Sequence, residues 1–116
     1  MSETTVENAV DLSGQVALVT GATSGLGRRF AQVLSSAGAA VVITGRRVER
    51  LDELAAEIDA AGGTALPLKL DMTDSAEIVS VVEEATERLS TITVLVNNAG
   101  VPDARRAHKM PIELVD

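Results

Sequence analysis

The stretch Val16–Gly27 constrains the fold most, because an apolar run leads straight into a glycine-rich turn and then into an amphipathic pattern. Val16–Thr20 is short, apolar and rich in β-branched residues, which predicts a strand that is buried on both faces. Gly21, Gly25 and Gly27 then remove side chains where the backbone must turn tightly and where a bulky anion could approach.

The residues after the turn have the periodicity of a helix with one apolar face. That face consists of Leu26, Phe30, Val33, Leu34 and Ala37. A strand, a glycine turn and a helix in this order bring free backbone N–H groups and the positive end of the helix dipole to one point, which predicts a phosphate-binding site. The alternative is a tight turn without a ligand. The glycine spacing, three residues and then one, differs from the usual dinucleotide fingerprint of one and then two.

The rest of the chain continues the alternation of strands and helices. We expect strands at 40–44, 64–70 and 92–97, with a helix between each pair of consecutive strands. Pro67 predicts that the third strand lies at an edge of the sheet, because proline cannot donate to a ladder of hydrogen bonds. The order βαβαβαβ predicts a doubly wound parallel sheet with the strand order 3-2-1-4.

Two details of this scheme concern the second half of the chain. Asp74 is expected to cap the third helix, in a capping box with Glu77. The buried face of that helix would consist of Ile78, Val82, Ala85 and Leu89. The strand at 92–97 would be an exposed edge, and the pattern at 111–116 predicts the first turn of another helix.

The motifs at the ends of the first and fourth strands resemble those of a known family. Thr20–Gly27 is similar to the cofactor turn of the short-chain dehydrogenase/reductase family, and Asn97–Gly100 is similar to that family's second signature. The resemblance begins at about Leu12 and implies a truncated Rossmann-type fold. It divides the chain into a flexible N-terminal tail, 1–11, and an incomplete NAD(P)-binding domain, 12–116.

The end of the second strand bears on the choice of cofactor. Gly45 stands where the family's dinucleotide sites often have an acid for the adenosine ribose, and Arg46 and Arg47 follow it. An arginine favours a 2′-phosphate, whereas a carboxylate would repel it. We therefore expect NADP(H) to be preferred, with NAD(H) possible. The alternative is that both arginines are solvated charges before a helix.

The resemblance also assigns residues to other parts of a bound dinucleotide. Asp71 matches the acid that accepts from the adenine amino group, with Met72 beside the ring, and the alternative for Asp71 is a helix cap shared with Thr73 and Asp74. The remaining contacts expected are those of Ser24 and the Leu26 backbone with the pyrophosphate, and of Asn98, Ala99 and Gly100 with the ribose and nicotinamide. Thr20, Asn97 and Asn98 are expected to brace the strands.

The catalytic half of the family pattern is missing. The resemblance implies a Tyr as acid/base with a Lys four residues later, but the chain has no Tyr, and Lys69 and Lys109 do not fit that spacing. No catalytic residue is therefore assigned, and the 116 residues alone are expected to be inactive. The complete protein would transfer hydride between NADP(H) and an alcohol or carbonyl substrate. The alternative is a non-catalytic nucleotide-binding or subunit-pairing module.

Composition and charge bear on the partners, metal sites and location that can be expected for this chain. The net charge of −7 argues against a nucleic-acid partner, and the absence of Cys argues against a disulfide framework or a thiolate metal site. No apolar stretch is long enough to span a membrane and no signal peptide is visible, so we expect a cytoplasmic protein without a metal site. A complete form is expected to be a homo-oligomer.

Overall fold

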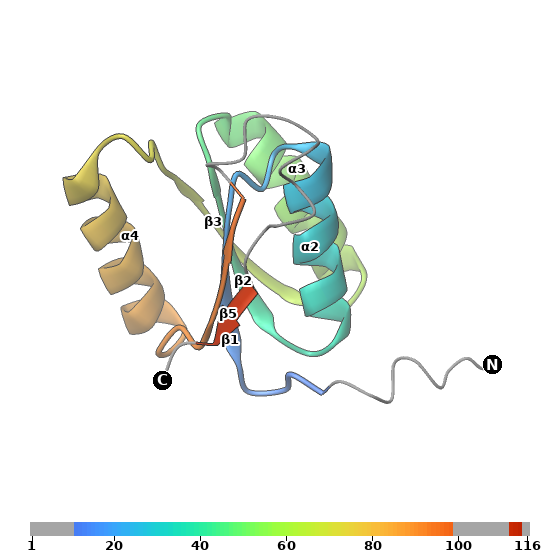
Figure 1. Cartoon of the computed structure of the whole chain (residues 1–116). Helices are drawn as coiled ribbons and strands as arrows, with labels where there is room; N and C mark the ends of the chain where they lie inside the picture. Colours follow the sequence, from blue (N-terminus) through green and yellow to red (C-terminus); the bar gives the residue numbers. More distant parts are fainter. Residues whose placement is uncertain (1–10, 99–111, 115–116) are drawn as a thin grey trace.

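The computed structural model describes residues 11–98 and 112–114 and contains one sheet with helices on both faces (Figure 1). The elements alternate as expected up to the fourth strand. In chain order they are β1 (Val16–Thr20), α2 (Gly25–Ser36), β2 (Ala40–Gly45), α3 (Val48–Ala60), β3 (Thr64–Lys69), α4 (Ser75–Arg88), β4 (Val94–Asn97) and β5 (Ile112–Leu114).

The sheet has the order β3-β2-β1-β4-β5, so the predicted order 3-2-1-4 is confirmed. β1 pairs in parallel with both β2 and β4, and β2 pairs in parallel with β3. β3 forms an edge, where Pro67 lies opposite Ile43. The missing N–H of the proline is tolerated there because an edge strand has a neighbour on one side only.

The prediction for the C-terminal residues was wrong. Ile112–Leu114 form strand β5, not the first turn of a helix, and β5 pairs antiparallel with β4. Val96 lies opposite Ile112 and Val94 opposite Leu114. β4 is therefore not the exposed edge that the sequence predicted. An antiparallel partner satisfies the row of N–H and C=O groups that an apolar parallel strand would otherwise expose.

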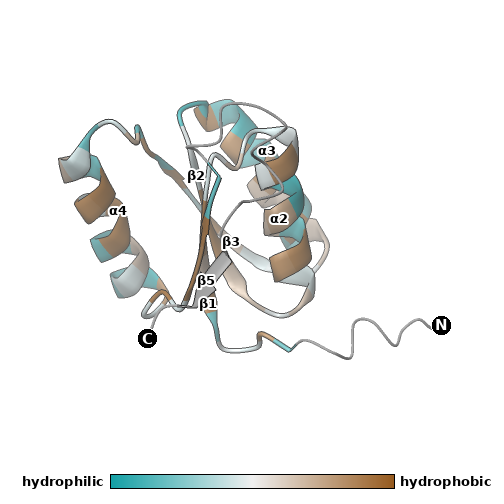
Figure 2. Ribbon diagram, in the orientation of Figure 1, coloured by the Kyte–Doolittle hydropathy of each residue, from teal (hydrophilic) through white to brown (hydrophobic). Residues whose placement is uncertain are grey.

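Two apolar layers cover the faces of the sheet, as expected from the alternation of strands and helices. α2 and α3 lie on one face and α4 on the other, with the apolar strands between them (Figure 2). β1 shows how the strands serve both layers, because Ala17 and Val19 belong to the core under α2 and α3, and Val16 and Leu18 to the core under α4. Successive residues of β1 serve opposite cores because side chains along a strand point alternately to its two faces.

The buried face of α2 agrees only in part with the one that the sequence predicted, because Leu34 is buried and Phe30 packs against the core but two other predicted residues do not. Gly27, Ala31 and Leu34 are buried, whereas Leu26 and Val33 are 38% and 57% exposed. The helix turns its smallest residues towards the sheet because it must approach the end of β1 closely. Periodicity of large apolar residues misses such a face, since glycine and alanine contribute little to it.

α4 begins as predicted but is rotated slightly. The Asp74 carboxylate accepts hydrogen bonds from Ala76 N at 3.0 Å and Glu77 N at 3.2 Å, so the cap is confirmed. The capping box is not formed, because Glu77 accepts from the backbone N–H of Asp71 instead. Ala85 is buried and Ile78 and Leu89 pack against the core as predicted, but Val82 is 38% exposed and Val81 is buried in its place. A lone helix on a sheet buries a narrow stripe, and Val82 lies beside it.

Candidate functional site

The turn between β1 and α2 is built around Gly21 and Ser24. Gly21 has a φ of +64°, a left-handed conformation that glycine adopts without strain. Ser24 is the N-cap of α2, and its Oγ accepts from Gly27 N at 3.3 Å and donates to Gly21 O at 3.0 Å. The side chain therefore fixes the start of the helix, a role that the sequence prediction of a pyrophosphate contact did not include.

Asn98, at the end of β4, joins this turn from the neighbouring strand. Its Nδ2 donates to Gly21 O at 3.0 Å and to Ser24 Oγ at 2.8 Å, and its backbone N–H donates to Thr20 Oγ1 at 2.9 Å. Thr20 Oγ1 also lies 3.1 Å from Asn97 Oδ1. The expected bracing by Thr20, Asn97 and Asn98 is therefore present in the structure. It holds the two predicted motifs together at one edge of the sheet.

The glycines of the turn serve different purposes. A Cβ at Gly27 would lie 2.2 Å from Gly21 O and 2.7 Å from Asn98 Nδ2, so this glycine is required by the fold itself. A Cβ at Gly25 would meet no described atom within 4 Å, and Gly25 has no positive φ. Neither packing nor backbone conformation explains glycine at this exposed position. The open space at the start of the helix fits the close approach of a phosphate.

Two backbone donors lie at this end of the helix without an acceptor among the described residues. Among the described residues, no acceptor contacts the N–H groups of Gly25 and Leu26, whereas Gly27 N bonds to Ser24 Oγ and Arg28 N to Ser24 O. Unpaired N–H groups in the first turn and the helix dipole both favour an anion. The residues present therefore fit the pyrophosphate of a dinucleotide.

The end of β2 lies beside this turn. Ala22 N donates to Thr44 O at 2.9 Å, and Thr44 Oγ1 donates to Val19 O at 3.1 Å. Gly45 ends the strand and is buried, and Arg46 and Arg47 follow it with exposed side chains. Arg47 is the N-cap residue of α3, but no side-chain hydrogen bond from the described residues caps that helix.

Asp71 lies after the neighbouring strand β3. Its Oδ1 accepts from Thr73 N at 3.0 Å and from Thr73 Oγ1 at 2.8 Å. These two hydrogen bonds, aided by the positive charges of Arg46 and Lys69, hold the pKa of the Asp71 carboxyl below its ordinary value. Met72 beside it is 39% exposed. The carboxylate is thus charged and accessible. The alternative, a helix cap shared with Thr73 and Asp74, is met only in the bonds to Thr73, because the N-cap of α4 is Asp74.

The structure leaves part of the expected site undescribed. Ala99 and Gly100 lie outside the described residues, as do residues 1–10 of the expected tail. Of the twelve site residues predicted from the sequence, those described all lie at the carboxyl ends of β1, β2, β3 and β4 or at the start of α2 (Figure 1). This is the edge where ligands bind in open parallel sheets.

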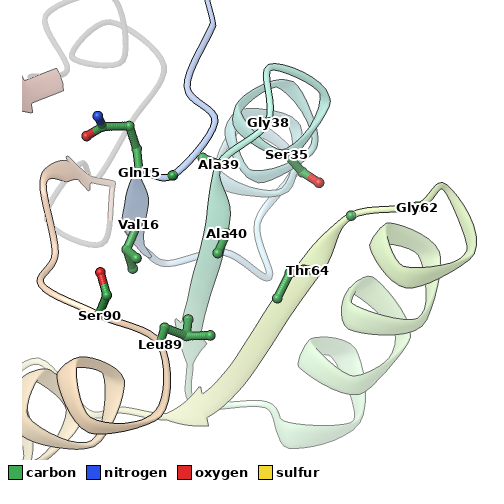
Figure 3. Close-up of a pocket in the computed structure, with 12 residues that line it drawn as sticks. Gln15, Val16, Ser35, Gly38, Ala39, Ala40, Gly62, Thr64, Leu89 and Ser90 are labelled. Carbon is green, nitrogen blue, oxygen red and sulfur yellow. The ribbon is translucent and has the colours of Figure 1, made fainter.

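A cavity of about 390 Å³ lies at the opposite edge of the sheet (Figure 3). It is bordered by the amino ends of β1, β2 and β3, at Val16, Ala40 and Thr64, and by Leu89 and Ser90 after α4. None of the predicted site residues lines it. Among the described residues, no helix is both long enough and apolar enough to cross a lipid bilayer.

Comparison with known proteins agrees with this geometry. A solved hydroxysteroid dehydrogenase from Escherichia coli is 33% identical, with a TM-score of 0.76 over 82% of this chain and 38% of that chain. A metagenomic short-chain oxidoreductase solved in complex with NADP is 47% identical, with a TM-score of 0.74 over 78% of this chain and 41% of that chain.

Sequence comparison gives the same result. Hydroxysteroid dehydrogenase-like protein 2 of Rattus norvegicus is 37% identical over 94% of this chain and 22% of its own length. The chain thus spans less than a third of the length of this curated relative. A family model described as short chain dehydrogenase matches residues 15–116. With its glycine turn, its sheet order and these matches, the chain belongs to the short-chain dehydrogenase/reductase family.

Proposed function

We propose that residues 12–116 are the dinucleotide-binding portion of an oxidoreductase that prefers NADP(H). The observation that carries this proposal is the open start of α2, where the N–H groups of Gly25 and Leu26 have no acceptor among the described residues. Asn98 and Ser24 hold this helix end beside β4, at the switch point of the sheet. The bound nicotinamide would supply or accept the hydride.

The preference for NADP(H) rests on the end of β2. Gly45 provides no carboxylate for a ribose diol, and Arg46 and Arg47 are exposed next to it. A 2′-phosphate would find two guanidinium groups and the uncapped first turn of α3. The metagenomic relative that was solved with NADP supports the same choice of cofactor. A charge-assisted contact of this kind contributes about 1.5–3 kcal/mol, or roughly ten- to a hundredfold in affinity.

Calorimetric titration of the chain with NADP⁺ and NAD⁺ tests this proposal. We expect tighter binding of NADP⁺, and Arg46→Ala should weaken it about tenfold or more while changing the affinity for NAD⁺ little. Arg88→Ala is the matched control, because Arg88 is an exposed arginine at the C-terminal end of α4, whose next residues Leu89 and Ser90 lie near the amino ends of the strands, away from this site. Equal affinities for the two cofactors, or equal losses in the two variants, would refute the preference.

The activity of a complete protein is a further part of the proposal. The chain carries no Tyr that could act as the family's proton donor, so we expect cofactor binding without turnover from these 116 residues. A longer product of the same gene would oxidise an alcohol or reduce a carbonyl and would assemble as a homo-oligomer. Absence of such turnover in a longer product with bound cofactor would favour a nucleotide-binding module instead. The cytoplasmic location stays a prediction.

A further inference from the structure

Gly45 is the position in β2 where a side chain would alter the cofactor site most directly. A Cβ built there would lie 3.1 Å from Thr23 Cγ2 and 3.5 Å from Thr23 Oγ1, with Leu51 Cδ2 at 3.7 Å. The first of these distances is tighter than ordinary van der Waals contact. Thr23, in the glycine turn, is therefore the nearest obstacle to a side chain at the end of β2.

Thr23 cannot easily withdraw from this position. The preceding residue, Ala22, is fully buried, and its N–H donates to Thr44 O at 2.9 Å. On the other side, Ser24 is held by its bonds to Gly21 O and Asn98 Nδ2. The backbone on both sides of Thr23 is thus tied to the sheet.

Rotation of the Thr23 side chain relieves the contact only in part. Both branches, Cγ2 and Oγ1, already face position 45. A threonine occupies two of the three staggered positions on Cβ, so every rotamer leaves at least one heavy atom facing Gly45. Removal of both branches opens the space completely.

We propose that Thr23 is a specificity-determining residue, which excludes a carboxylate from position 45 and thereby keeps the site selective for a 2′-phosphate. The inference rests on the proposed binding of NADP(H). It adds that the selection of NADP(H) over NAD(H) depends on a pair of residues, Thr23 and Gly45, and not on Arg46 and Arg47 alone. A carboxylate at position 45 should therefore be accommodated only when Thr23 loses its branches.

A set of variants in the full 116-residue chain tests the pair. Thr23→Ala removes both branches, whereas Thr23→Val keeps both and removes only the hydroxyl, which makes it the matched control. Each is combined with Gly45→Asp, and with Gly45→Ala as a smaller probe that adds Cβ alone. Thermal unfolding followed by circular dichroism is measured for every variant, and NAD⁺ and NADP⁺ are titrated by calorimetry.

We expect Gly45→Ala and Gly45→Asp each to lower Tm by at least about 3 °C when Thr23 is present. The loss should be recovered in combination with Thr23→Ala but not with Thr23→Val. Thr23→Ala/Gly45→Asp should shift the ratio of the NAD⁺ and NADP⁺ affinities towards NAD⁺ by about tenfold or more relative to the unaltered chain.

The outcomes separate this inference from the proposed function. Equal recovery by Thr23→Val, or no loss of Tm in the Gly45 variants, would overturn the pairing of Thr23 with Gly45. Recovery of Tm without a change in the affinity ratio would overturn the role of the pair in specificity. If the unaltered chain binds neither dinucleotide, the proposed function fails, and the role of the pair in specificity fails with it. The thermal measurements still decide whether Thr23 and Gly45 are coupled.

Discussion

Asn98 Nδ2 donates to Ser24 Oγ at 2.8 Å and so joins the end of β4 to the N-cap of α2, across 74 positions of sequence. Ser24 Oγ then has three partners, since it also donates to Gly21 O and accepts from Gly27 N. A hydroxyl has one donor and two acceptor sites, so its capacity is filled. The serine that begins the helix is thereby oriented by the neighbouring strand, and the first-turn N–H groups of Gly25 and Leu26 stay open to a ligand.

Asn98→Asp should destabilise the chain and weaken binding of the dinucleotide. The substitution replaces the amide NH2 group, which donates both hydrogen bonds, with a carboxylate oxygen beside Gly21 O, in a residue that is 7% exposed. Loss of these bonds at a buried position should cost about 1–3 kcal/mol of unfolding free energy, measured by chemical denaturation. Asn97→Asp is the control, because Asn97 is exposed and the Oδ1 that contacts Thr20 is retained. Similar losses in both variants would contradict the bridging role of Asn98.

Gly25→Ala and Gly27→Ala should have opposite effects on folding. At Gly27 the added methyl would lie 2.2 Å from Gly21 O, a backbone atom, so we expect a loss of about 1–3 kcal/mol in unfolding free energy. At Gly25 there is open space, and alanine in the first turn of a helix should be neutral or stabilising by up to about 1 kcal/mol. Calorimetric titration should nevertheless show weaker NADP⁺ binding by Gly25→Ala, because the methyl enters the space assigned to the phosphate. Unchanged affinity would argue against that assignment.

Thr73→Val should raise the pKa of Asp71. The hydroxyl of Thr73 and its backbone N–H both stabilise the charged carboxylate, and the variant removes only the hydroxyl. The Asp71 pKa, measured by carbon-13 NMR titration, should therefore move up towards its ordinary value of 3.8 without reaching it. Thr86→Val, which alters a hydroxyl bound to a helix carbonyl, should leave the Asp71 titration unchanged.

The same pKa predicts how stability depends on pH. Because the folded pKa of Asp71 lies below its unfolded value, its contribution to stability is present above the ordinary value of 3.8 and is lost as the pH falls through the folded pKa. In Thr73→Val this contribution should be smaller, and its loss should be complete at a higher pH, because only the folded pKa is raised. Acid unfolding curves that coincide for the two proteins would contradict the prediction.

Glu57→Gln should change stability little, although Glu57 links α2 to α3. Its carboxylate pairs with Arg28 and accepts from Gln32 Nε2 at 3.2 Å, but the paired side chains of Arg28 and Glu57 are 32% and 47% exposed. Solvent screens such pairs, and we expect a loss below about 1 kcal/mol that disappears in 1 M salt. A larger loss, or one that salt does not reduce, would mean that the link between the two helices determines their packing.

The sequence by itself determined the elements from β1 to β4 and the order of these four strands in the sheet. The apolar runs, the helical periodicities and the glycines at helix ends are local signals, and each corresponds to an element that the structure contains. The strand order 3-2-1-4 followed from this alternation together with the rules for parallel sheets. Pro67 on the edge strand and the Asp74 cap were also predictable, because both depend on the chemistry of one residue and its immediate neighbours.

Only the tertiary structure decided which surfaces meet. α2 buries Gly27 and Ala31 because the helix has to approach Gly21, a constraint that hydrophobic periodicity does not contain. The pairing of β5 with β4 joins a strand to a partner that no local pattern specifies. The contacts of Asn98 with Ser24 and of Thr23 with position 45 likewise depend on how strands and turns are placed in three dimensions. Local patterns fix backbone conformation, whereas close approach between distant residues is fixed by packing of the whole core.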